Sequence, residues 1–367
     1  MKKISRRNAL AAGTAAGMTL GAACSTVKDE TLKETGPGRE EHWGPGRDMS
    51  IPKKITLGST PVRLGSLLWP SETKKFGSDF DGLIQSFHAQ GQTALVVPGE
   101  FLIPLSSSEI ADFNTALKKY DVIVSAVMGN RYTNFIHPDL SFRQQYLKNL
   151  ARYMELAESV DCPAVPTICG TLAPETPEGA TFQELFKKEY RFSMHPDNWS
   201  LKTWDLLVKN LRQVLDDTSG MKVSIAMEAQ VTTTIDGPLA HKRLIDDVGS
   251  PRLGVEFDPV NMISIDNYYY TTELINESFD LLGESILTCH AKDSTIWPTR
   301  QTVHVQEVCP GRGVMDYTTY FARMSTFKWP RMLLPEHIPG DQFPEAYAFL
   351  KKMAAETGVG LHPGLKV

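Results

Sequence analysis

Several features that mark other protein classes are missing from this sequence. It has only five cysteines in 367 residues, and none of them forms a C-x-x-C pair, which argues against a zinc knuckle and a dense disulfide framework. No G-x-G-x-x-G follows a strand-like run, so the usual dinucleotide-binding fingerprint is absent. The net charge is −5 and basic residues do not cluster beyond the first few positions, which argues against a nucleic-acid partner.

Residues 1–24 are expected to form an export signal. Four basic side chains within residues 2–7 precede a small-residue apolar stretch over 9–23 that is too short for a normal membrane span. Residues 5–10 (SRRNAL) resemble the twin-arginine export motif. The stretch ending at Cys24 resembles a lipoprotein cleavage site shifted by one residue, so a lipid on Cys24 would be the contact with a membrane. We expect an exported bacterial protein, periplasmic or anchored as a lipoprotein.

The rest of the chain divides into a polar lead-in and one large domain. Residues 25–57 are polar, lack apolar periodicity and contain two Gly-Pro-Gly turns, as expected for a tether. Residues 58–367 suit a single domain of barrel size, and a 41% apolar composition is enough for a sizeable core. Disulfides between Cys162 and Cys169, or between Cys289 and Cys309, are left open by the sequence.

Short apolar runs alternate with helical patterns along this domain. The runs are nearly continuous, as strands covered on both faces require, and they span 62–68, 93–97, 122–127, 164–169, 223–227, 253–257, 286–289 and 332–334. Between them, Ser106 is predicted to cap a helix, and apolar residues recur at helical spacing over 141–160 and 198–217. The pattern predicts an α/β fold, a (β/α)8 TIM barrel, with a doubly wound open sheet as the alternative.

Four of the predicted strands end in side chains that bind metals. Glu228, Asp258, His290 and Glu336 each follow or close an apolar run, with gaps of 30, 32 and 46 residues that leave room for one helix between strands. A parallel barrel brings the carboxyl ends of its strands to one face. Carboxylates with one histidine suit Mn²⁺, Mg²⁺ or Co²⁺, with Zn²⁺ as a further candidate. Any one of these residues alone could equally cap a loop or form a salt bridge; the set of four predicts one divalent-metal site.

The same strand ends resemble a known family. The segments Met227-Glu228, 257–261 (FDPVN), 289–293 (CHAKD) and Pro335-Glu336 are similar to the xylose isomerase-like TIM barrel superfamily, the sugar phosphate isomerase/epimerase group. Residues 311–317 (GRGVMDY) resemble that group's segment after the seventh strand. The resemblance covers roughly residues 60 to 357 and rests on four short motifs in the same order on consecutive strands.

The resemblance implies roles for these residues. Glu228, Asp258, His290 and Glu336 match the four metal ligands, and in the family's epimerases the two glutamates also exchange a proton with the substrate from opposite faces. It therefore implies a divalent-metal-dependent isomerase or epimerase that removes a proton next to a carbonyl through a metal-bound enediolate.

Two departures from the epimerases weaken that expectation. Asn261 stands where they have a substrate-contacting histidine, and Ile296 replaces an arginine, for which Arg300 is the nearest substitute. The DNA-repair endonucleases of this fold need additional histidines for three zinc ions, and this chain lacks them, so a nucleic-acid substrate is not expected.

Other candidate residues lie near the strand ends. Lys292 is a candidate acid or donor to a substrate oxygen, with a salt bridge to Asp293 or to a neighbouring carboxylate as the equal alternative. His304, in the polar loop 299–306, is a candidate proton shuttle, although a solvated histidine is the simpler interpretation. Asn261, Trp69, Trp297 and Arg300 are candidate substrate-binding residues. The two tryptophans could line the pocket, because aromatic rings pack on the apolar faces of sugars, although a tryptophan in the core or on the rim is the simpler interpretation.

The predicted location narrows the substrate. Phosphorylated sugars are scarce outside the cytoplasm and no phosphate cradle is visible, so the expected partner is a free small-molecule sugar or glycoside. The same proton abstraction can run as an elimination, which gives a 3-keto-glycoside lyase or hydratase as an alternative. A barrel that binds carbohydrate without turnover is a third reading. The oligomeric state stays open.

Overall fold

The computed structural model describes residues 56–129, 134–172, 194–299 and 301–363. These residues belong to one compact unit, Lys54–Val367. All eight predicted strands are present, with ends that differ by at most two residues from those expected. Their bounds are β1 Arg63–Leu67, β2 Ala94–Pro98, β3 Ile123–Met128, β4 Ala164–Ile168, β5 Ser224–Glu228, β6 Leu253–Phe257, β7 Ile286–Ala291 and β10 Met332–Pro335.

The eight strands form a nearly closed parallel barrel. Their order is β3-β2-β1-β10-β7-β6-β5-β4, and every hydrogen-bonded pair in this sheet is parallel. The two end strands, β3 and β4, lie side by side. The predicted TIM barrel is therefore confirmed. Because all strands run the same way, the carboxyl ends of β5, β6, β7 and β10 share one face.

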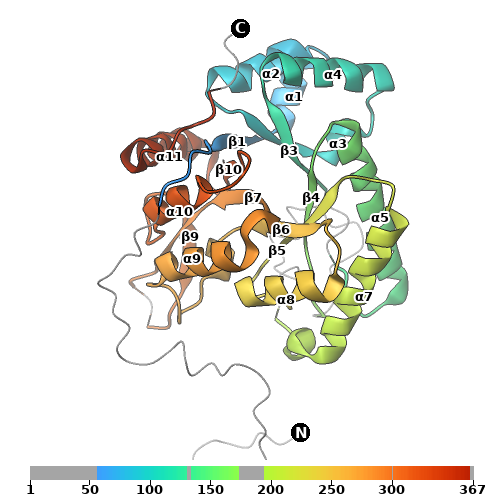
Figure 1. The fold of residues 1–367 in the computed structure, drawn as a ribbon, viewed down its shortest axis with the longest axis vertical. Helices are drawn as coiled ribbons and strands as arrows, with labels where there is room; N and C mark the ends of the chain where they lie inside the picture. Colours follow the sequence, from blue (N-terminus) through green and yellow to red (C-terminus); the bar gives the residue numbers. More distant parts are fainter. Residues whose placement is uncertain (1–55, 130–133, 173–193, 300, 364–367) are drawn as a thin grey trace, which may run out of the picture. The chain divides into compact units, whose positions relative to one another are not determined.

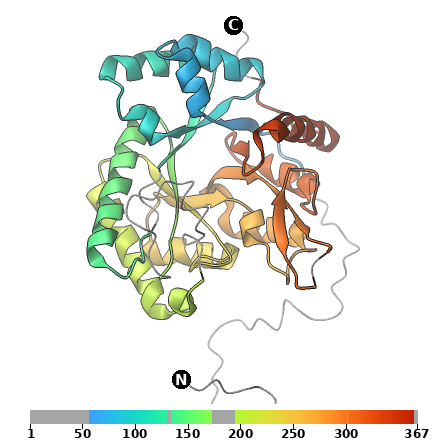
Figure 2. The same ribbon diagram turned by 180° about the vertical axis from the view of Figure 1, so that it is seen from behind.

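Helices cover the outside of the barrel, as Figures 1 and 2 show. In α7, buried Trp204, Leu207 and Leu211 recur every three or four residues, so this helix turns one apolar stripe toward the strands. The helices of the described residues are α1 Pro70–Phe76, α2 Phe80–Ala89, α3 Gly99–Leu102, α4 Ser107–Lys119, α5 Leu140–Ser159, α7 Leu201–Asp217, α8 Pro238–Val248, α9 Thr271–Leu282, α10 Tyr317–Met324 and α11 Phe343–Thr357, with short 3₁₀ turns Pro196–Trp199, Val260–Met262, Gly283–Ser285 and Gly340–Gln342.

The predicted cap of α4 is confirmed in detail. The hydroxyl of Ser106 accepts a hydrogen bond from the backbone N–H of Glu109, and the Glu109 carboxylate accepts one from the backbone N–H of Ser106. This reciprocal box satisfies two backbone donors that the first helical turn leaves without partners.

One segment differs from the expectation of a polar loop over 299–306. Strands β8 (Asp293–Ile296) and β9 (Val305–Val308) pair antiparallel and form a hairpin between β7 and α10. Residues 305 and 306 of the expected loop belong to β9. Strand β9 has no buried residue and no continuous apolar run, so the apolar-run criterion missed the hairpin.

The structure also bears on the cysteines and on membrane-spanning helices. Cys162, Cys169, Cys289 and Cys309 are buried free thiols, so neither disulfide left open by the sequence is formed. Within the described part of the chain, no helix combines the length and the apolar character that crossing a bilayer requires. The predicted export signal and Cys24 lie outside the described residues.

Candidate metal centre

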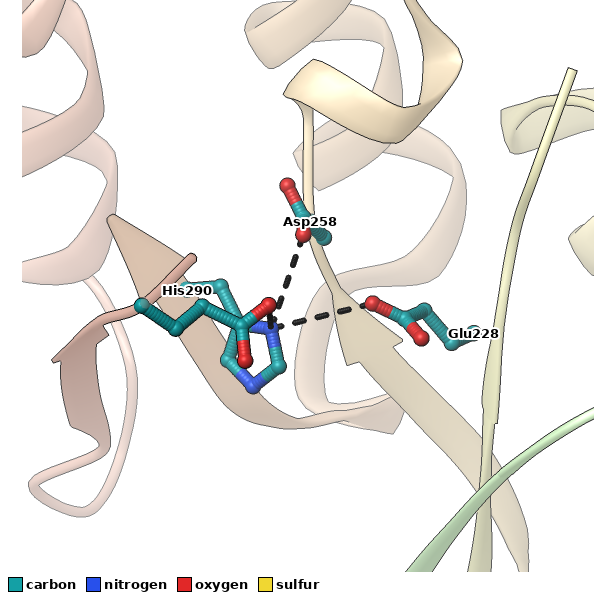
Figure 3. A group of neighbouring side chains, drawn as sticks. Glu228, Asp258 and His290 are labelled. Carbon is teal, nitrogen blue, oxygen red and sulfur yellow. Dashed lines mark ion pairs between the residues drawn. The ribbon is translucent and has the colours of Figure 1, made fainter. Parts of the chain in front are cut away.

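The four predicted ligand side chains meet at the carboxyl ends of neighbouring strands. Glu228 is the last residue of β5, Asp258 directly follows β6, His290 lies near the end of β7, and Glu336 directly follows β10. One ligand atom from each lies within 4.8 Å of the others. Figure 3 shows Glu228 and Asp258 directed toward the ring of His290.

His290 Nδ1 is the atom around which the three carboxylates gather. It lies 2.9 Å from Glu336 Oε1, 3.5 Å from Asp258 Oδ2 and 3.7 Å from Glu228 Oε1. The side chains of Asp258 and His290 are 0% and 6% exposed, whereas those of Glu228 and Glu336 are 14% and 22% exposed, so the group is buried on one side and reached by water on the other. Three carboxylates in such a small buried volume repel one another strongly unless a cation compensates them.

Two atoms of this group are suited to bind a cation. Asp258 Oδ2 and His290 Nδ1 are buried and make no well-formed hydrogen bond within the described structure, although both lie close to charged neighbours. Buried polar atoms normally have such partners. Together with the oxygen-rich donor set and the short mutual distances, these two atoms show that the residues fit a hard divalent cation.

Glu256 holds the other side of the histidine ring. Its Oε1 lies 3.1 Å from His290 Nε2 and accepts a hydrogen bond from Thr288 Oγ1 at 3.4 Å. A carboxylate on the far nitrogen fixes the ring so that Nδ1 faces the ligand group. Sequence reasoning missed Glu256. The available clue was its position two residues before Asp258, which places both side chains on the same face of β6.

The side chain of Lys292 lies among the four candidate ligands. Its side chain is 1% exposed, and Nζ lies 2.6 Å from Asp258 Oδ2 and 2.9 Å from Glu336 Oε1. Of its two predicted roles, the salt bridge is thus present, with the ligand carboxylates rather than with Asp293. The candidate role as an acid or as a donor to a substrate oxygen is compatible with this position, because the ammonium lies among the candidate ligands.

Asn261 connects Lys292 to Glu228. Its Nδ2 donates to Glu228 Oε1 at 2.8 Å, and its Oδ1 accepts from Lys292 Nζ at 3.2 Å. The predicted substrate-binding residue therefore lies in the site and fixes the orientation of one glutamate. A neutral amide can do this because it carries both a donor and an acceptor.

The charges of the site shift the pKa values in opposite directions. Burial, together with the Glu256 carboxylate, raises the pKa of Glu228 well above its usual range. Burial also opposes ionisation of Glu336, but the positive charges of His290 and Lys292 outweigh it and hold the pKa of Glu336 well below the usual value.

The two cationic groups respond in the complementary way. Burial disfavours the charged forms of His290 and Lys292, yet the surrounding carboxylates outweigh it and raise the pKa of both well above their ordinary values. The carboxylates thus recruit two positive charges at this position. A divalent cation supplies the same compensation with one ion.

Two further polar residues approach from outside the four strands. Glu307 on β9 places Oε1 3.4 Å from Lys292 Nζ, and its Oε2 lies 3.1 Å from His337 Nδ1. His337 follows Glu336 directly and has a left-handed backbone with φ of 56°. Neither residue was predicted. The approach of Glu307 depends on the hairpin that sequence reasoning missed, whereas the clue to His337 was its position next to Glu336.

Asp293 organises the segment that resembles the family motif. Its carboxylate accepts backbone hydrogen bonds from Ser294, Gly311, Gly313 and Met315 at 2.9 to 3.0 Å. A Cβ at Gly313 would lie 2.2 Å from Asp293 Oδ1, so only glycine allows this close approach. Asp293 therefore shapes the loop beside the site rather than pairing with Lys292.

The remaining predicted residues lie farther out or outside the described chain. Trp69 is 41% exposed at the start of α1 and packs edge-on against Phe343. Trp297 is 43% exposed at the end of β8, and its backbone N–H donates to the carbonyl of His304. The ring of His304 is exposed beside Thr302 Oγ1 at 3.1 Å. Arg300 lies outside the described residues. The assigned roles of these four stay predictions.

Comparison with known proteins agrees with the barrel fold. The profile of the family described as xylose isomerase-like TIM barrel matches residues 73–353. No curated protein matches the chain in sequence.

Solved structures give a matching fold at low sequence identity. A xylose isomerase-like TIM barrel protein from Mycobacterium smegmatis in complex with magnesium has a TM-score of 0.56 at 16% identity, covering 82% of this chain and 97% of its own. D-psicose 3-epimerase from Clostridium cellulolyticum H10 has 0.55 at 13%, covering 82% and 100%. The 3-keto-D-glucoside 4-epimerase YcjR from E. coli has 0.53 at 15%, covering 80% and 100%. At these identities the likeness shows the fold alone.

Proposed function

Because the chain belongs to the xylose isomerase-like TIM barrel family, we propose that it is a divalent-metal-dependent sugar isomerase or epimerase acting on a non-phosphorylated sugar or keto-sugar. The observation that carries the proposal is the convergence of Glu228, Asp258, His290 and Glu336, with one atom from each within 4.8 Å of the others. A bound Mn²⁺, Co²⁺ or Mg²⁺, or alternatively Zn²⁺, would acidify the C–H bond next to a sugar carbonyl.

The two glutamates are suited to move the proton. In the sheet order, β7 and β6 lie between β10 and β5, so Glu336 and Glu228 approach the centre from different sides. A sugar carbon placed between them would present one face to each carboxylate. One glutamate can then accept the proton, and either one can return it, which gives inversion or transfer to the neighbouring carbon.

Lys292 and Asn261 support this transfer. The ammonium of Lys292 can donate to a substrate oxygen on which negative charge develops, because it is buried at the same face. Asn261 holds Glu228 Oε1 through its amide N–H, so the position of that carboxylate is fixed before the substrate arrives. A mutation at Asn261 should therefore lower turnover more than it weakens substrate binding.

Export favours an unphosphorylated substrate. We propose that the chain carries its predicted signal to the periplasm or, with a lipid on Cys24, to a membrane surface. Free sugars and glycosides are available there, whereas sugar phosphates are scarce. The partner is accordingly a small neutral carbohydrate.

A 3-keto-glycoside lyase is the second candidate, favoured by the amide of Asn261 at the position of the epimerase histidine and by the likeness to a keto-glucoside epimerase. One glutamate would remove the C2 proton, the C1–O bond would break, and the aglycone would leave as an alcohol after taking up a proton. Addition of water to the resulting glycal would complete a hydratase reaction. Both candidates share their first step.

The deciding experiment follows hydrogen exchange. Metal-loaded protein is incubated in D₂O with free ketoses and, separately, with 3-keto-glucosides. Deuterium at C2 or C3 without cleavage supports epimerisation, and release of the aglycone supports the lyase. If the protein binds metal and carbohydrate but no substrate exchanges, the enzymatic proposal fails and a carbohydrate-binding barrel remains.

A further inference from the structure

Glu307 reaches the metal centre from an element that carries none of the ligands. It lies on β9 of the hairpin, and its carboxylate bridges Lys292 Nζ at 3.4 Å and His337 Nδ1 at 3.1 Å. Its side chain is 39% exposed, whereas that of Lys292 is 1% exposed. The buried ammonium thus has a partly solvated carboxylate directly outside the ligand group.

Lys292 blocks the place that a cation needs. Its Nζ lies 2.6 Å from Asp258 Oδ2 and 2.9 Å from Glu336 Oε1, and both carboxylates are ligand candidates. A divalent cation held by the same two oxygens would repel an ammonium at those distances. The ammonium must therefore withdraw when the cation binds, and it needs another acceptor because it is buried.

Two acceptors lie within reach of that movement. Asn261 Oδ1 lies 3.2 Å from Lys292 Nζ, and Glu307 Oε1 lies 3.4 Å from it. The amide oxygen of Asn261 is neutral, so of these two acceptors Glu307 is the one that offers a full negative charge. His337 fixes the second oxygen of Glu307 from the residue next to Glu336. The hairpin carboxylate is thereby tied to one of the ligand strands.

Resting on the metal dependence proposed above, we infer that Glu307 is a positioning residue that receives the Lys292 ammonium when the cation binds, and that it sets the cation affinity in this way. Lys292 is a competitor for the ligand oxygens, and Glu307 removes that competitor. The two residues therefore act on cation affinity with opposite sign. A purely structural ion pair would instead make the two substitutions change affinity in the same direction.

Calorimetric titration of the metal-stripped full chain with Mn²⁺ tests this inference without any substrate. Glu307→Gln should weaken Mn²⁺ binding about 10-fold, an effect typical of residues that orient metal ligands without binding the metal. Lys292→Met should tighten binding by at least about 10-fold, because one like charge is removed. In the Lys292→Met background, Glu307→Gln should have almost no effect.

Glu345→Gln is the matched control. Glu345 also forms an ion pair, with exposed Arg312, and its replacement removes the same charge without touching the site. Its Mn²⁺ affinity should equal that of the wild type. Glu307→Asp keeps the charge and should recover part of the affinity lost in Glu307→Gln.

The inference is overturned if Glu307→Gln binds Mn²⁺ as tightly as the wild type, or if it loses the same factor with and without Lys292. Should Lys292→Met not fold by circular dichroism, the series of Glu307→Gln, Glu307→Asp and Glu345→Gln still decides. A wild-type chain that binds no divalent cation would refute the proposed function itself. If the wild type and Glu307→Gln bind Mn²⁺ with equal affinity, only the role of Glu307 is refuted.

Discussion

The two ends of the barrel both bury charged side chains, but in opposite ways. At the amino end, Arg63 at the start of β1 donates to the carbonyl oxygens of Thr93 and Asp121 at 3.1 and 2.8 Å and to the Asp121 carboxylate at 3.1 Å. His362 lies 3.0 Å from the same guanidinium. One cation is thus surrounded by acceptors that match the fixed directions of its N–H groups.

At the carboxyl end, charge is in excess of what the side chains can satisfy. Three ligand carboxylates compete for His290 and Lys292, and Asp258 Oδ2 has no well-formed hydrogen bond to any residue that the structure describes. Such an arrangement costs stability unless something else binds there. The comparison indicates that the amino end uses buried charge to hold strands together, whereas the carboxyl end retains it for a cation and a substrate.

The largest effect is expected for the proton-transfer carboxylates. Glu228→Gln and Glu336→Gln should each reduce substrate deuterium exchange by about 10² to 10⁴-fold, because the amide cannot accept the proton. Stability of the metal-free protein should stay the same or rise in Glu228→Gln, because the raised pKa of Glu228 marks an unfavourable charge. It should fall in Glu336→Gln, because His290 and Lys292 lose a carboxylate that pairs with both. Exchange rates and urea unfolding of the same preparations measure both. If a variant lost much stability but kept deuterium exchange, the carboxyl end would have a structural role and not the catalytic role assigned to it.

The amino end should show the converse. Arg63→Met should lower the free energy of unfolding by about 2–4 kcal/mol, because two backbone carbonyls and a partly buried carboxylate lose their partner. Exchange activity per folded molecule should be unchanged. Lys119→Met, which removes the exposed ion pair with Asp81, is the control and should leave stability nearly unaltered. Loss of activity in folded Arg63→Met would show that the ends are coupled.

A buried neutral histidine on α8 gives the next prediction. Burial lowers the pKa of His241 to about 4, and its Nε2 lies 3.0 Å from the carbonyl of Met227. The unfolded chain takes up this proton near pH 6.5 and the folded chain only near pH 4, so stability is complete above pH 6.5 and declines as the pH falls toward 4. The loss reaches about 2 kcal/mol at pH 5, from 1.36 kcal/mol for each pH unit.

His241→Gln isolates this contribution. Urea unfolding at pH 7 and pH 5 should show a difference between the two pH values that is smaller by about 2 kcal/mol in the variant than in the wild type. Comparison of the two proteins cancels the titration of the carboxylates that both contain. An identical pH dependence in the two proteins would mean that His241 is protonated in the folded state.

The sequence predicted the ligands because each one is part of a local pattern. Glu228, Asp258 and His290 each close an apolar run, and parallel strands necessarily bring such ends to one face. The helix start at Ser106 was predicted for the same reason, since its cap involves residues only three positions apart. Nothing in these predictions required knowledge of which strand lies beside which.

The other site residues depend on contacts that no local pattern encodes. Glu256 on β6 contacts His290 on the neighbouring strand β7. Glu307 contacts Lys292 only because β8 and β9 fold back as a hairpin. Arg63 likewise joins residues 58 and 299 positions away. Sequence spacing alone gives no distance between such groups. A charged residue inside a buried strand, as at Glu256, is the clue that was available and unused.

The smallest effect tests whether location at the carboxyl end is sufficient for a functional role. Ser106 follows β2 and α3 on the chain segment that leaves this end, but it serves only to cap α4. Ser106→Ala should lower the free energy of unfolding by about 1 kcal/mol, and Ser106→Asp should largely preserve it, because aspartate also accepts from the backbone N–H. Metal affinity and deuterium exchange should not change in either variant. If Ser106→Ala altered Mn²⁺ affinity while Ser106→Asp did not, the helix cap would be part of the site. The functional region would then include the whole carboxyl face of the barrel and not only the ends of β5, β6, β7 and β10.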